Sequence, residues 1–266
     1  MEKNVLVSII TVSYNSEKTI SKTIESVLNQ TYKKIEYIII DGSSTDSTVD
    51  IIRSYENKFG EKKIKYKWIS EKDKGIYDAM NKGIKLAKGL IIGIINSDDY
   101  YFPNTIERVV EAFENTKADI VHGDVQVIYD SVEEIFIRKS SEKFLYRKMS
   151  INHPATFVKK EVYERYGFFD EHFEIAGDYE LILRFKVNNL KFFYLNETLT
   201  VFKAGGASYR NLNKNMKEVY LIQKKYFNTI SATKNLVIKK LDYSIKNVFK
   251  KLFGEKFYYK MKRLLK

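Results

Sequence analysis

The sequence predicts an α/β protein in which a mostly parallel sheet is flanked by helices and followed by a basic helical C-terminal extension. In the first hundred residues, β-branched apolar runs alternate with segments of helical periodicity, the pattern of strand–helix–strand units with right-handed crossovers. After residue 100 the order changes to a hairpin and further helices. Residues 203 to 266 carry 17 Lys and Arg against 3 Asp and Glu, so the net charge of +12 belongs to the C-terminal segment.

Four strands and three helices are expected before residue 100. The first helix follows a Ser at a suitable N-cap position and places Ile20, Ile24 and Val27 at helical spacing. A turn cluster rich in Ser and Asp separates the second strand from the second helix, and Gly89 ends the third helix. The expected strands are residues 5–12, 35–40, 63–69 and 90–95, and the expected helices are residues 16–30, 47–57 and 76–88.

The second half of the chain predicts an antiparallel hairpin, three helices and one long strand. Gly205 and Gly206 mark a boundary before the basic extension, which begins at about residue 213. The hairpin is expected at residues 120–128 and 135–139, the helices at 105–115, 158–167 and 178–188, and the strand at 191–202.

Composition restricts the function classes. With 266 residues, of which 44% are hydrophobic and 30% charged, the chain has the composition of a globular protein with a sizeable core. The absence of Cys excludes disulfides, thiolate nucleophiles and Cys-based zinc sites, and the three His residues are not spaced as ligands. Because the sequence contains neither a leader nor a run of about eighteen apolar residues, we expect a cytoplasmic protein that does not span a membrane.

Asp98 and Asp99 directly follow the apolar run 90–95, at the carboxyl end of an expected buried strand. Ligands of open α/β sheets bind at this edge. Adjacent carboxylates repel each other, and a divalent cation that keeps open positions for substrate phosphates would relieve the repulsion. The competing interpretation is an acidic turn that caps the next helix, and the residues alone leave both open.

Polar residues also follow the first two strands at the same edge. Asp41 ends the second strand and can accept a hydrogen bond from a pyrimidine N–H, whereas Ser44 and Asp46 are better placed to cap the following helix. Thr11 and Asn15 lie where the chain leaves the first strand, and capping is the preferred interpretation for Asn15.

Asp178 lies at the start of an expected helix, where the helix dipole stabilises an ionised carboxylate. Such a carboxylate can take a proton from a hydroxyl, but a helix N-cap is the competing interpretation, and spacing alone favours the cap. The chain contains no Gly-x-Gly-x-x-Gly, no Gly-Lys-Ser/Thr loop and no Gly-x-Ser-x-Gly. These absences argue against dinucleotide enzymes, P-loop enzymes and serine hydrolases.

Five segments, in this order, resemble motifs of the inverting nucleotide-sugar glycosyltransferases of family 2, which have the GT-A fold. They are the opening strand 7–15, the Asp-Gly-Ser turn in 38–48, the donor-binding segment 71–83, the Asp-x-Asp region 96–99 and the base motif 177–180. The resemblance covers residues 4 to 206, and segment 73–83 is most similar to colanic-acid and O-antigen transferases, which build bacterial surface polysaccharides. It implies a nucleotide-sugar-binding half in residues 1–100, an acceptor-binding half in 101–206 and a helical extension in 207–266.

The resemblance also implies roles for single residues. Asp99 binds a Mn²⁺ or Mg²⁺ ion that bridges the diphosphate of the donor, for which a UDP-sugar is the expected class. Asp178 takes the proton of an acceptor hydroxyl in a single displacement that inverts the anomeric carbon. Thr11 and Asp41 are assigned to the base, Asp73 to the base or the ribose, and Asp98 to the ribose. These nucleotide-binding residues are Thr11, Asn15, Asp41, Asp73 and Asp98.

Two positions depart from the commonest family pattern. Ser97 occupies the first acidic position of the Asp-x-Asp region, and Gly177 replaces the Glu that precedes the base, so Asp178 is the only base candidate in its motif. His153 and Glu180 are the candidates for contact with the acceptor, and a structural loop histidine is the other interpretation of His153.

Residues 236 to 253 place apolar side chains at helical spacing with lysines between them, the pattern of a basic amphipathic helix. We expect this helix to bind the anionic inner face of the cell membrane, where lipid-linked acceptors lie; packing on the catalytic body or in a homo-oligomer is the alternative. A sugar-nucleotide pyrophosphorylase is a rival enzyme, but its Gly-rich loop is missing. The non-enzymatic rival is a lipid or nucleic-acid binder acting through the tail, although the nearly neutral body argues against nucleic acid.

Overall fold

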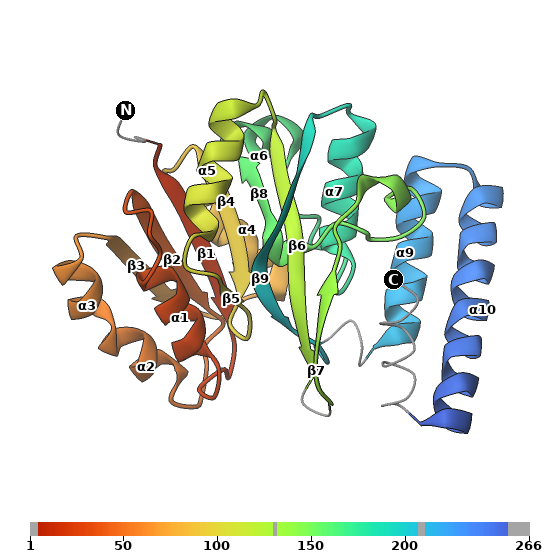
Figure 1. Cartoon of the computed structure of the whole chain (residues 1–266), viewed down its shortest axis with the longest axis horizontal. Coiled ribbons are helices and arrows are strands. Elements are labelled where there is room, and N and C mark those ends of the chain that lie inside the picture. Colours follow the sequence, from red (N-terminus) through yellow and green to blue (C-terminus); the bar gives the residue numbers. More distant parts are fainter. Residues whose placement is uncertain (1–4, 130–131, 207–210, 255–266) are drawn as a thin grey trace.

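One mixed sheet forms the centre of the computed structural model, which describes residues 5–129, 132–206 and 211–254 (Figure 1). Its nine described strands follow the order β3-β2-β1-β4-β8-β6-β9-β5, and β7 pairs with β6. The first four strands in this order are mutually parallel, so their connections cross over the faces of the sheet as helices. They are β3 (Lys65–Ser70), β2 (Ile35–Asp41), β1 (Val7–Ser13) and β4 (Ile91–Asn96).

The later strands join this parallel half at β4. Strand β8 runs antiparallel to both β4 and β6, β6 runs parallel to β9, and the short β5 pairs antiparallel with β9. The β5–β9 pairing brings the acidic pair that precedes β5 next to the carboxyl end of β9. The bounds are β5 (Tyr100–Tyr101), β6 (Ile120–Tyr129), β7 (Val132–Arg138), β8 (Thr156–Lys159) and β9 (Phe192–Lys203).

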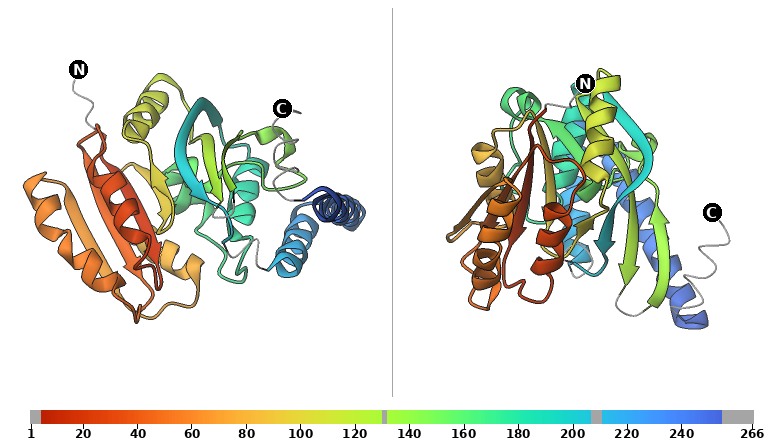
Figure 2. Two further views of the ribbon diagram at one scale, coloured as in Figure 1. Left: turned by 60° about the horizontal axis from the view of Figure 1, so that its bottom comes forward. Right: turned by 60° about the vertical axis from the view of Figure 1, so that its left-hand side comes forward.

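Helices cover both faces of the sheet (Figure 2). Alternation along β1 builds the two layers, because Ile9 faces one buried cluster and Ile10 the other. The first layer holds α1 (Ile20–Leu28), α2 (Thr48–Ser54), α3 (Glu56–Glu61) and α5 (Thr105–Asn115). The second holds α4 (Ile76–Leu86), α6 (Lys160–Tyr166) and α7 (Gly177–Val187). Two short 3-10 helices are η1 (Glu142–Phe144) and η2 (His153–Ala155).

Two helices form the described part of the C-terminal extension. Helix α9 (Leu212–Tyr226) packs against α7 and contributes Val219 and Ile222 to the second core cluster. Helix α10 (Thr229–Phe253) contacts α9 and lies at the edge of the molecule, on the right in Figure 1. Among the described residues, no helix combines the length and apolar character needed to cross a membrane. The predicted extension also includes residues 255–266, which lie outside the described residues.

The predicted α/β class is confirmed, with local differences. The single helix predicted at 47–57 is two short helices, α2 and α3, which meet at Tyr55. The segment predicted as helix 158–167 begins with the end of strand β8, and α6 starts only at Lys160. Helix α1 starts at Ile20 with Thr19 as its N-cap residue, and the Ser16 side chain contacts Tyr14 and Ser97 and does not cap the helix. The short strand β5 was not predicted. The division into residues 1–100, 101–206 and 207–266 stays a prediction, although one sheet spans the first two parts.

Candidate active site

Asp99 is fully buried at the end of β4 and has one oxygen without a partner. Its Oδ1 accepts a hydrogen bond from the N–H of Lys203 at 2.9 Å, whereas Oδ2 has no hydrogen bond within the described part of the chain. Asn96 Oδ1 is a second buried oxygen without a partner there. Burial and the neighbouring charge of Asp98 raise the pKa of Asp99 well above its usual value. An unpaired buried carboxylate needs a cation or a proton.

These oxygens fit a divalent cation with few protein ligands. Within the described residues, no group of three or more His, Asp or Glu side chains is arranged to hold a metal ion. Asp99 would therefore hold a cation only with further ligands from water or substrate, which is the usual arrangement for Mg²⁺ bound to phosphates. The acidic turn is not a helix cap, because no side chain caps α5 and its N-cap residue is Asn104.

Asp41 is fully buried and has all its hydrogen-bonding positions occupied. Its carboxylate accepts hydrogen bonds from the hydroxyls of Ser13, Ser44 and Ser70 and from the Ser44 N–H, at 2.5 to 3.0 Å. These contacts hold the turn after β2 against β1 and β3. A nucleobase N–H would have to replace one of the hydroxyls to reach Asp41. Asp46, as the sequence indicated, accepts from the first N–H of α2 instead.

Tyr14, Gly42 and Asp73 lie close together at the ends of β1, β2 and β3. A Cβ on Gly42 would lie 2.5 Å from Asp73 Oδ2 and 3.5 Å from the Tyr14 ring, so a side chain at residue 42 would require the Asp73 carboxylate to move. The N–H of Gly75 donates to Asp73 Oδ1 at 2.9 Å and fixes the carboxylate. The Tyr14 side chain is 63% exposed and offers a free aromatic face beside these residues. The sequence did not mark Tyr14 as a site residue, although Tyr14 lies between Thr11 and Asn15, which were predicted to bind the nucleotide.

Thr11 and Asn15 serve the framework of this edge. Thr11 is fully buried, and its Oγ1 accepts a hydrogen bond from the hydroxyl of Tyr37 at 2.9 Å in the first core layer. The structure therefore does not bring its side chain to the edge. Asn15 Oδ1 accepts from the N–H of Thr45 at 2.9 Å, so it supports the loop after β2 rather than capping α1. Contact of either residue with a nucleotide stays a prediction.

Asp178 is the second residue of α7, and Ala176 occupies the N-cap position without a capping side chain. Asp178 Oδ1 accepts from the N–H of Tyr179 at 2.7 Å. Burial raises the pKa of Asp178 to about 6, although the Tyr179 N–H and the positive charge of Arg138 oppose the rise. The backbone N–H groups at the start of α7 favour the ionised form, as expected for a helix N-terminus, but desolvation outweighs them. A carboxylate with a pKa near neutrality is suited to proton transfer.

Tyr77 of α4 contacts the start of α7. Its hydroxyl donates to the carbonyl of Ile175 at 2.8 Å and accepts from the N–H of Asp178 at 3.3 Å. Its ring lies so close to Gly177 that a Cβ there would be 2.6 Å from ring carbon Cε2. This contact explains why residue 177 lacks the carboxylate side chain that the family motif has.

Arg138 at the end of β7 joins the two carboxylates electrostatically. Its Nε donates to Asn152 Oδ1 at 2.7 Å, and its guanidinium lies 4.5 Å from the centroid of the Phe202 ring. Its positive charge lowers the pKa of both Asp99 and Asp178. No motif marks Arg138, and only the pairing of β7 with β6 brings it here.

The two candidate acceptor residues are placed differently. Burial lowers the pKa of His153 to about 4, so its imidazole is neutral at pH 7, and its buried Nε2 has no hydrogen bond among the described residues. Glu180 is fully buried and contacts Arg184, Lys225 and the hydroxyl of Tyr226, which ties α7 to α9. The structure does not bring Glu180 to the edge that holds Asp99, and acceptor contact by either residue stays a prediction.

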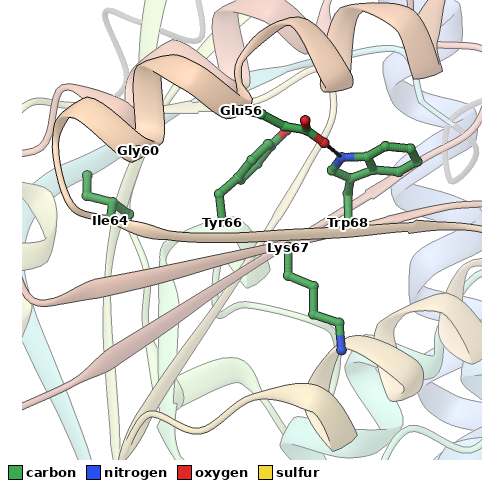
Figure 3. A pocket seen from close by; sticks show the side chains of 6 residues that line it. All are labelled: Glu56, Gly60, Ile64, Tyr66, Lys67 and Trp68. Atoms are coloured by element: carbon green, nitrogen blue, oxygen red, sulfur yellow. Dashed lines mark hydrogen bonds between the residues drawn. The ribbon is translucent and has the colours of Figure 1, made fainter.

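A separate hollow of about 570 Å³ lies between α3 and the edge strand β3. In Figure 3, Tyr66 and Trp68 point toward α3 and Lys67 points away from it, and the Trp68 indole N–H donates to Glu56 at 2.8 Å. Gly60 of α3 and Ile64, the residue just before β3, also line the hollow. The hollow therefore opens along the outer edge of the sheet and not at the strand ends that carry Asp41 and Asp99.

Residues 8–178 match the family model described as glycosyl transferase family 2, and the chain belongs to this family. An uncharacterised glycosyltransferase of Mycobacterium tuberculosis (strain CDC 1551 / Oshkosh) is 36% identical over 184 residues, which cover 67% of this chain and 68% of the relative. A PGL/p-HBAD biosynthesis glycosyltransferase of Mycobacterium bovis (strain BCG / Pasteur 1173P2) is 30% identical over 179 residues, 66% of this chain and 68% of the relative. The predicted class of enzyme, a glycosyltransferase, is confirmed.

Solved structures of low sequence identity share the fold. Residues 1–349 of S. aureus TarS, in complex with UDP-GlcNAc, superpose with a TM-score of 0.68 at 19% identity, over 87% of this chain and 70% of that one. The mannosyltransferase PcManGT from Pyrobaculum calidifontis, in complex with GDP-Man and Mn²⁺, superposes with a TM-score of 0.64 at 15% identity. The match covers 97% of this chain and 83% of that one. The chain spans only 39% of a longer TarS structure. These similarities confirm the predicted GT-A architecture.

Proposed function

We propose that this chain transfers a sugar from a nucleoside diphosphate sugar to a hydroxyl group, with inversion at the anomeric carbon. The observation that carries the proposal is the pair Asp99 and Asp178. One carboxylate keeps a buried oxygen without a partner in the described chain, and the other has a pKa of about 6. Both lie within the field of Arg138. A cation site together with a base of near-neutral pKa is what metal-assisted displacement by a hydroxyl requires.

The donor is a UDP-sugar in this proposal. Tyr14 offers an exposed aromatic face on which a base can stack, and Asp73 and Gly42 lie beside it. The Asp41 carboxylate accepts hydrogen bonds from three serine hydroxyls, and the N–H of a pyrimidine base can take the place of one of them. Asp98, partly exposed next to Asp99, faces the ribose. The similar TarS structure is a complex with UDP-GlcNAc, which supports a uridine donor.

In the proposed site Asp99 would hold the cation, and oxygen atoms of the donor would complete its coordination. When bound, Mn²⁺ or Mg²⁺ neutralises the charge that develops on the departing nucleoside diphosphate. The similar mannosyltransferase was solved in complex with GDP-Man and Mn²⁺, which supports a divalent cation in the proposed reaction. Arg138 adds a positive charge on the same side.

Asp178 is the proposed general base. Its carboxylate takes the proton of the acceptor hydroxyl while the hydroxyl oxygen forms a bond to the anomeric carbon from the face opposite the leaving group. The bond from the anomeric carbon to the diphosphate oxygen breaks, and its electron pair leaves with the nucleoside diphosphate. No covalent enzyme intermediate forms. His153, neutral at pH 7, is available for a hydrogen bond to the acceptor and not as a cation.

The proposed acceptor is a glycan or lipid-linked glycan of the bacterial cell surface, reached at an anionic membrane face. Along α10 the exposed residues Leu241, Ile245, Val248 and Leu252 recur at helical spacing and form a continuous apolar stripe, the α10 stripe. Lys240 and Lys251 are exposed on the same helix. Apolar residues bordered by lysines suit binding in the plane of an anionic bilayer. The relative named for PGL/p-HBAD biosynthesis supports a cell-envelope glycan.

A screen of nucleotide sugars tests the proposal. The full-length protein is incubated with a panel of UDP-sugars and GDP-sugars, with Mn²⁺ or with a chelator, and the released nucleoside diphosphate is measured. We expect Mn²⁺-dependent release from at least one UDP-sugar, because donor hydrolysis uses the same leaving-group site as transfer. Absence of release from every donor, together with absence of stabilisation by UDP and Mn²⁺, would contradict the proposal.

A further inference from the structure

Helix α9 inserts a buried carboxylate into the segment that precedes the proposed base. Glu218 is 6% exposed, and its carboxylate accepts hydrogen bonds from three successive backbone N–H groups. Glu174 N–H donates to Oε1 at 3.2 Å, and the N–H groups of Ile175 and Ala176 donate to Oε2 at 2.9 and 2.8 Å. Hydrogen bonds of backbone N–H groups to a charged acceptor are among the stronger ones in proteins.

These contacts fix the segment that leads into α7. Ala176, the N-cap residue of α7, has no side chain that can accept a hydrogen bond. Glu218 binds the backbone N–H groups just before the helix, while Tyr77 of α4 holds the carbonyl of Ile175. Ile175 is thus fixed by its N–H from α9 and by its carbonyl from α4, three residues before Asp178.

We propose that Glu218 is a positioning residue for Asp178, so that helix α9 is a working part of the active site and not an appendage. The inference rests on the proposed function, because it assumes that Asp178 is the base. Glu218 acts through the segment 174–176, which sets the direction in which the first turn of α7 presents the Asp178 carboxylate.

Further contacts between the same two helices support this role. Gln223 of α9 donates through Nε2 to the hydroxyl of Tyr179 at 3.1 Å, and Lys225 contacts Glu180 at 3.0 Å. Tyr179 and Glu180 are the two residues that follow Asp178. Residues of α9 therefore contact the chain on both sides of the proposed base.

Glu218 also acts on Asp178 through its charge. The titratable and charged groups that influence Asp178 are Tyr77 from α4, Arg138 from β7 and Glu218 from α9. The negative charge of Glu218 raises the pKa of Asp178, and the positive charge of Arg138 lowers it. Because the base acts when deprotonated, activity rises with pH through its pKa of about 6. Loss of the Glu218 charge lowers that pKa, so the acidic limb of the rate profile moves to lower pH.

The test compares two variants of the full-length chain. Glu218→Gln removes the buried charge and replaces one acceptor oxygen by an NH₂ group that cannot accept from the backbone. Glu174→Gln is the matched control, because the exposed Glu174 side chain pairs with Lys214 of the same α9. The measurements are UDP release from the best UDP-sugar as a function of pH, and thermal stabilisation by UDP with Mn²⁺.

We expect Glu218→Gln to lower kcat about 10- to 100-fold, as a displaced catalytic group does, and to move the acidic limb to lower pH. Stabilisation by UDP with Mn²⁺ should stay as in wild type, and Glu174→Gln should resemble wild type throughout. Arg138→Gln should move the limb to higher pH. A Glu218→Gln protein with an unchanged limb and a kcat within about twofold of wild type would overturn the inference.

If Glu218→Gln does not fold, Glu218→Asp takes its place, since it keeps the charge but withdraws the carboxylate from the three N–H groups. It should lower kcat and leave the acidic limb where it is, and a kcat equal to wild type would overturn the inference. Asp178→Asn, measured in parallel, separates the two proposals. If it keeps wild-type activity, the proposed base is wrong; if it loses activity while Glu218→Gln does not, only the role of Glu218 is wrong.

Discussion

The ring of Tyr77 lies against Gly177 so closely that a Cβ at residue 177 would be 2.6 Å from Cε2 of the ring. This contact joins α4, which overlaps the predicted donor-binding segment 71–83, to the helix that carries Asp178. It also explains the departure from the family motif at residue 177, since any side chain there requires the Tyr77 ring to move.

The contact predicts a strong coupling between the two positions. Gly177→Ala should destabilise the protein by about 1–3 kcal/mol, because the new methyl group overpacks the interface. In a Tyr77→Ala background, the same change should be neutral or stabilising, because Ala is a better helix former than Gly by about 1 kcal/mol. Denaturant unfolding of the four proteins of the double-mutant cycle measures the coupling. Equal effects of Gly177→Ala in both backgrounds would contradict the contact.

Asp99→Asn should abolish stabilisation by Mn²⁺ in the presence of UDP. Thermal unfolding with UDP, with and without Mn²⁺, measures this. Asp46→Asn is the control, since Asp46 caps α2 and should keep the full metal-dependent shift. A wild-type shift in Asp99→Asn would show that the acidic pair is a structural turn.

The same variant tests the burial of Asp99 without metal. Its folded pKa is raised above the ordinary 3.8. The protonated form is therefore favoured in the folded state, and stability is lost as pH rises through the folded pKa. Asp99→Asn removes this loss and keeps the acceptor for the Lys203 N–H, so at pH 8 without metal it should gain about 1–3 kcal/mol. If the variant is less stable than wild type under these conditions, the conclusion that Asp99 is a buried carboxylate with an unpaired oxygen is wrong.

Leu241→Gln combined with Ile245→Gln should weaken sedimentation of the full-length protein with anionic vesicles, because these side chains are 57% and 68% exposed on the α10 stripe. Leu90→Gln is the control, since Leu90 is 66% exposed on the catalytic body. Raised salt should weaken binding of the wild-type protein too, because the lysines contribute. Equal vesicle binding by all three proteins would favour the α10 stripe as a contact between copies of the chain.

The parallel half of the fold could be predicted because its signals are local. The apolar run before Asp98 and the helical spacing from Ile20 to Leu28 each lie within a few residues, and the strands end where the polar clusters begin. Strand β8 could not be predicted, since its four residues run directly into α6 and only pairing with β4 and β6 makes them a strand.

The site was predicted unevenly for the same reason. The carboxylates of Asp99 and Asp178 follow recognisable local patterns, but the direction of the Asp178 pKa depends on burial by distant segments. The hydrogen bonds that Asp41 accepts from three serines, on two strands and the turn after β2, cannot be predicted from any one segment. Arg138 and Glu218 carry no motif, and only the pairing of β7 and the docking of α9 bring them to the site.

Asp178→Asn tests the central claim most directly, because Asn keeps the shape of the side chain and the acceptor for the Tyr179 N–H but has no useful basicity. The measurement is the rate of UDP release, and of sugar transfer once an acceptor is found, from the best UDP-sugar at saturating Mn²⁺. We predict a fall of about 10²- to 10⁴-fold, the usual contribution of a general base, with unchanged stabilisation by UDP and Mn²⁺. A folded variant that binds UDP with Mn²⁺ and reacts within about threefold of wild type would contradict the mechanism.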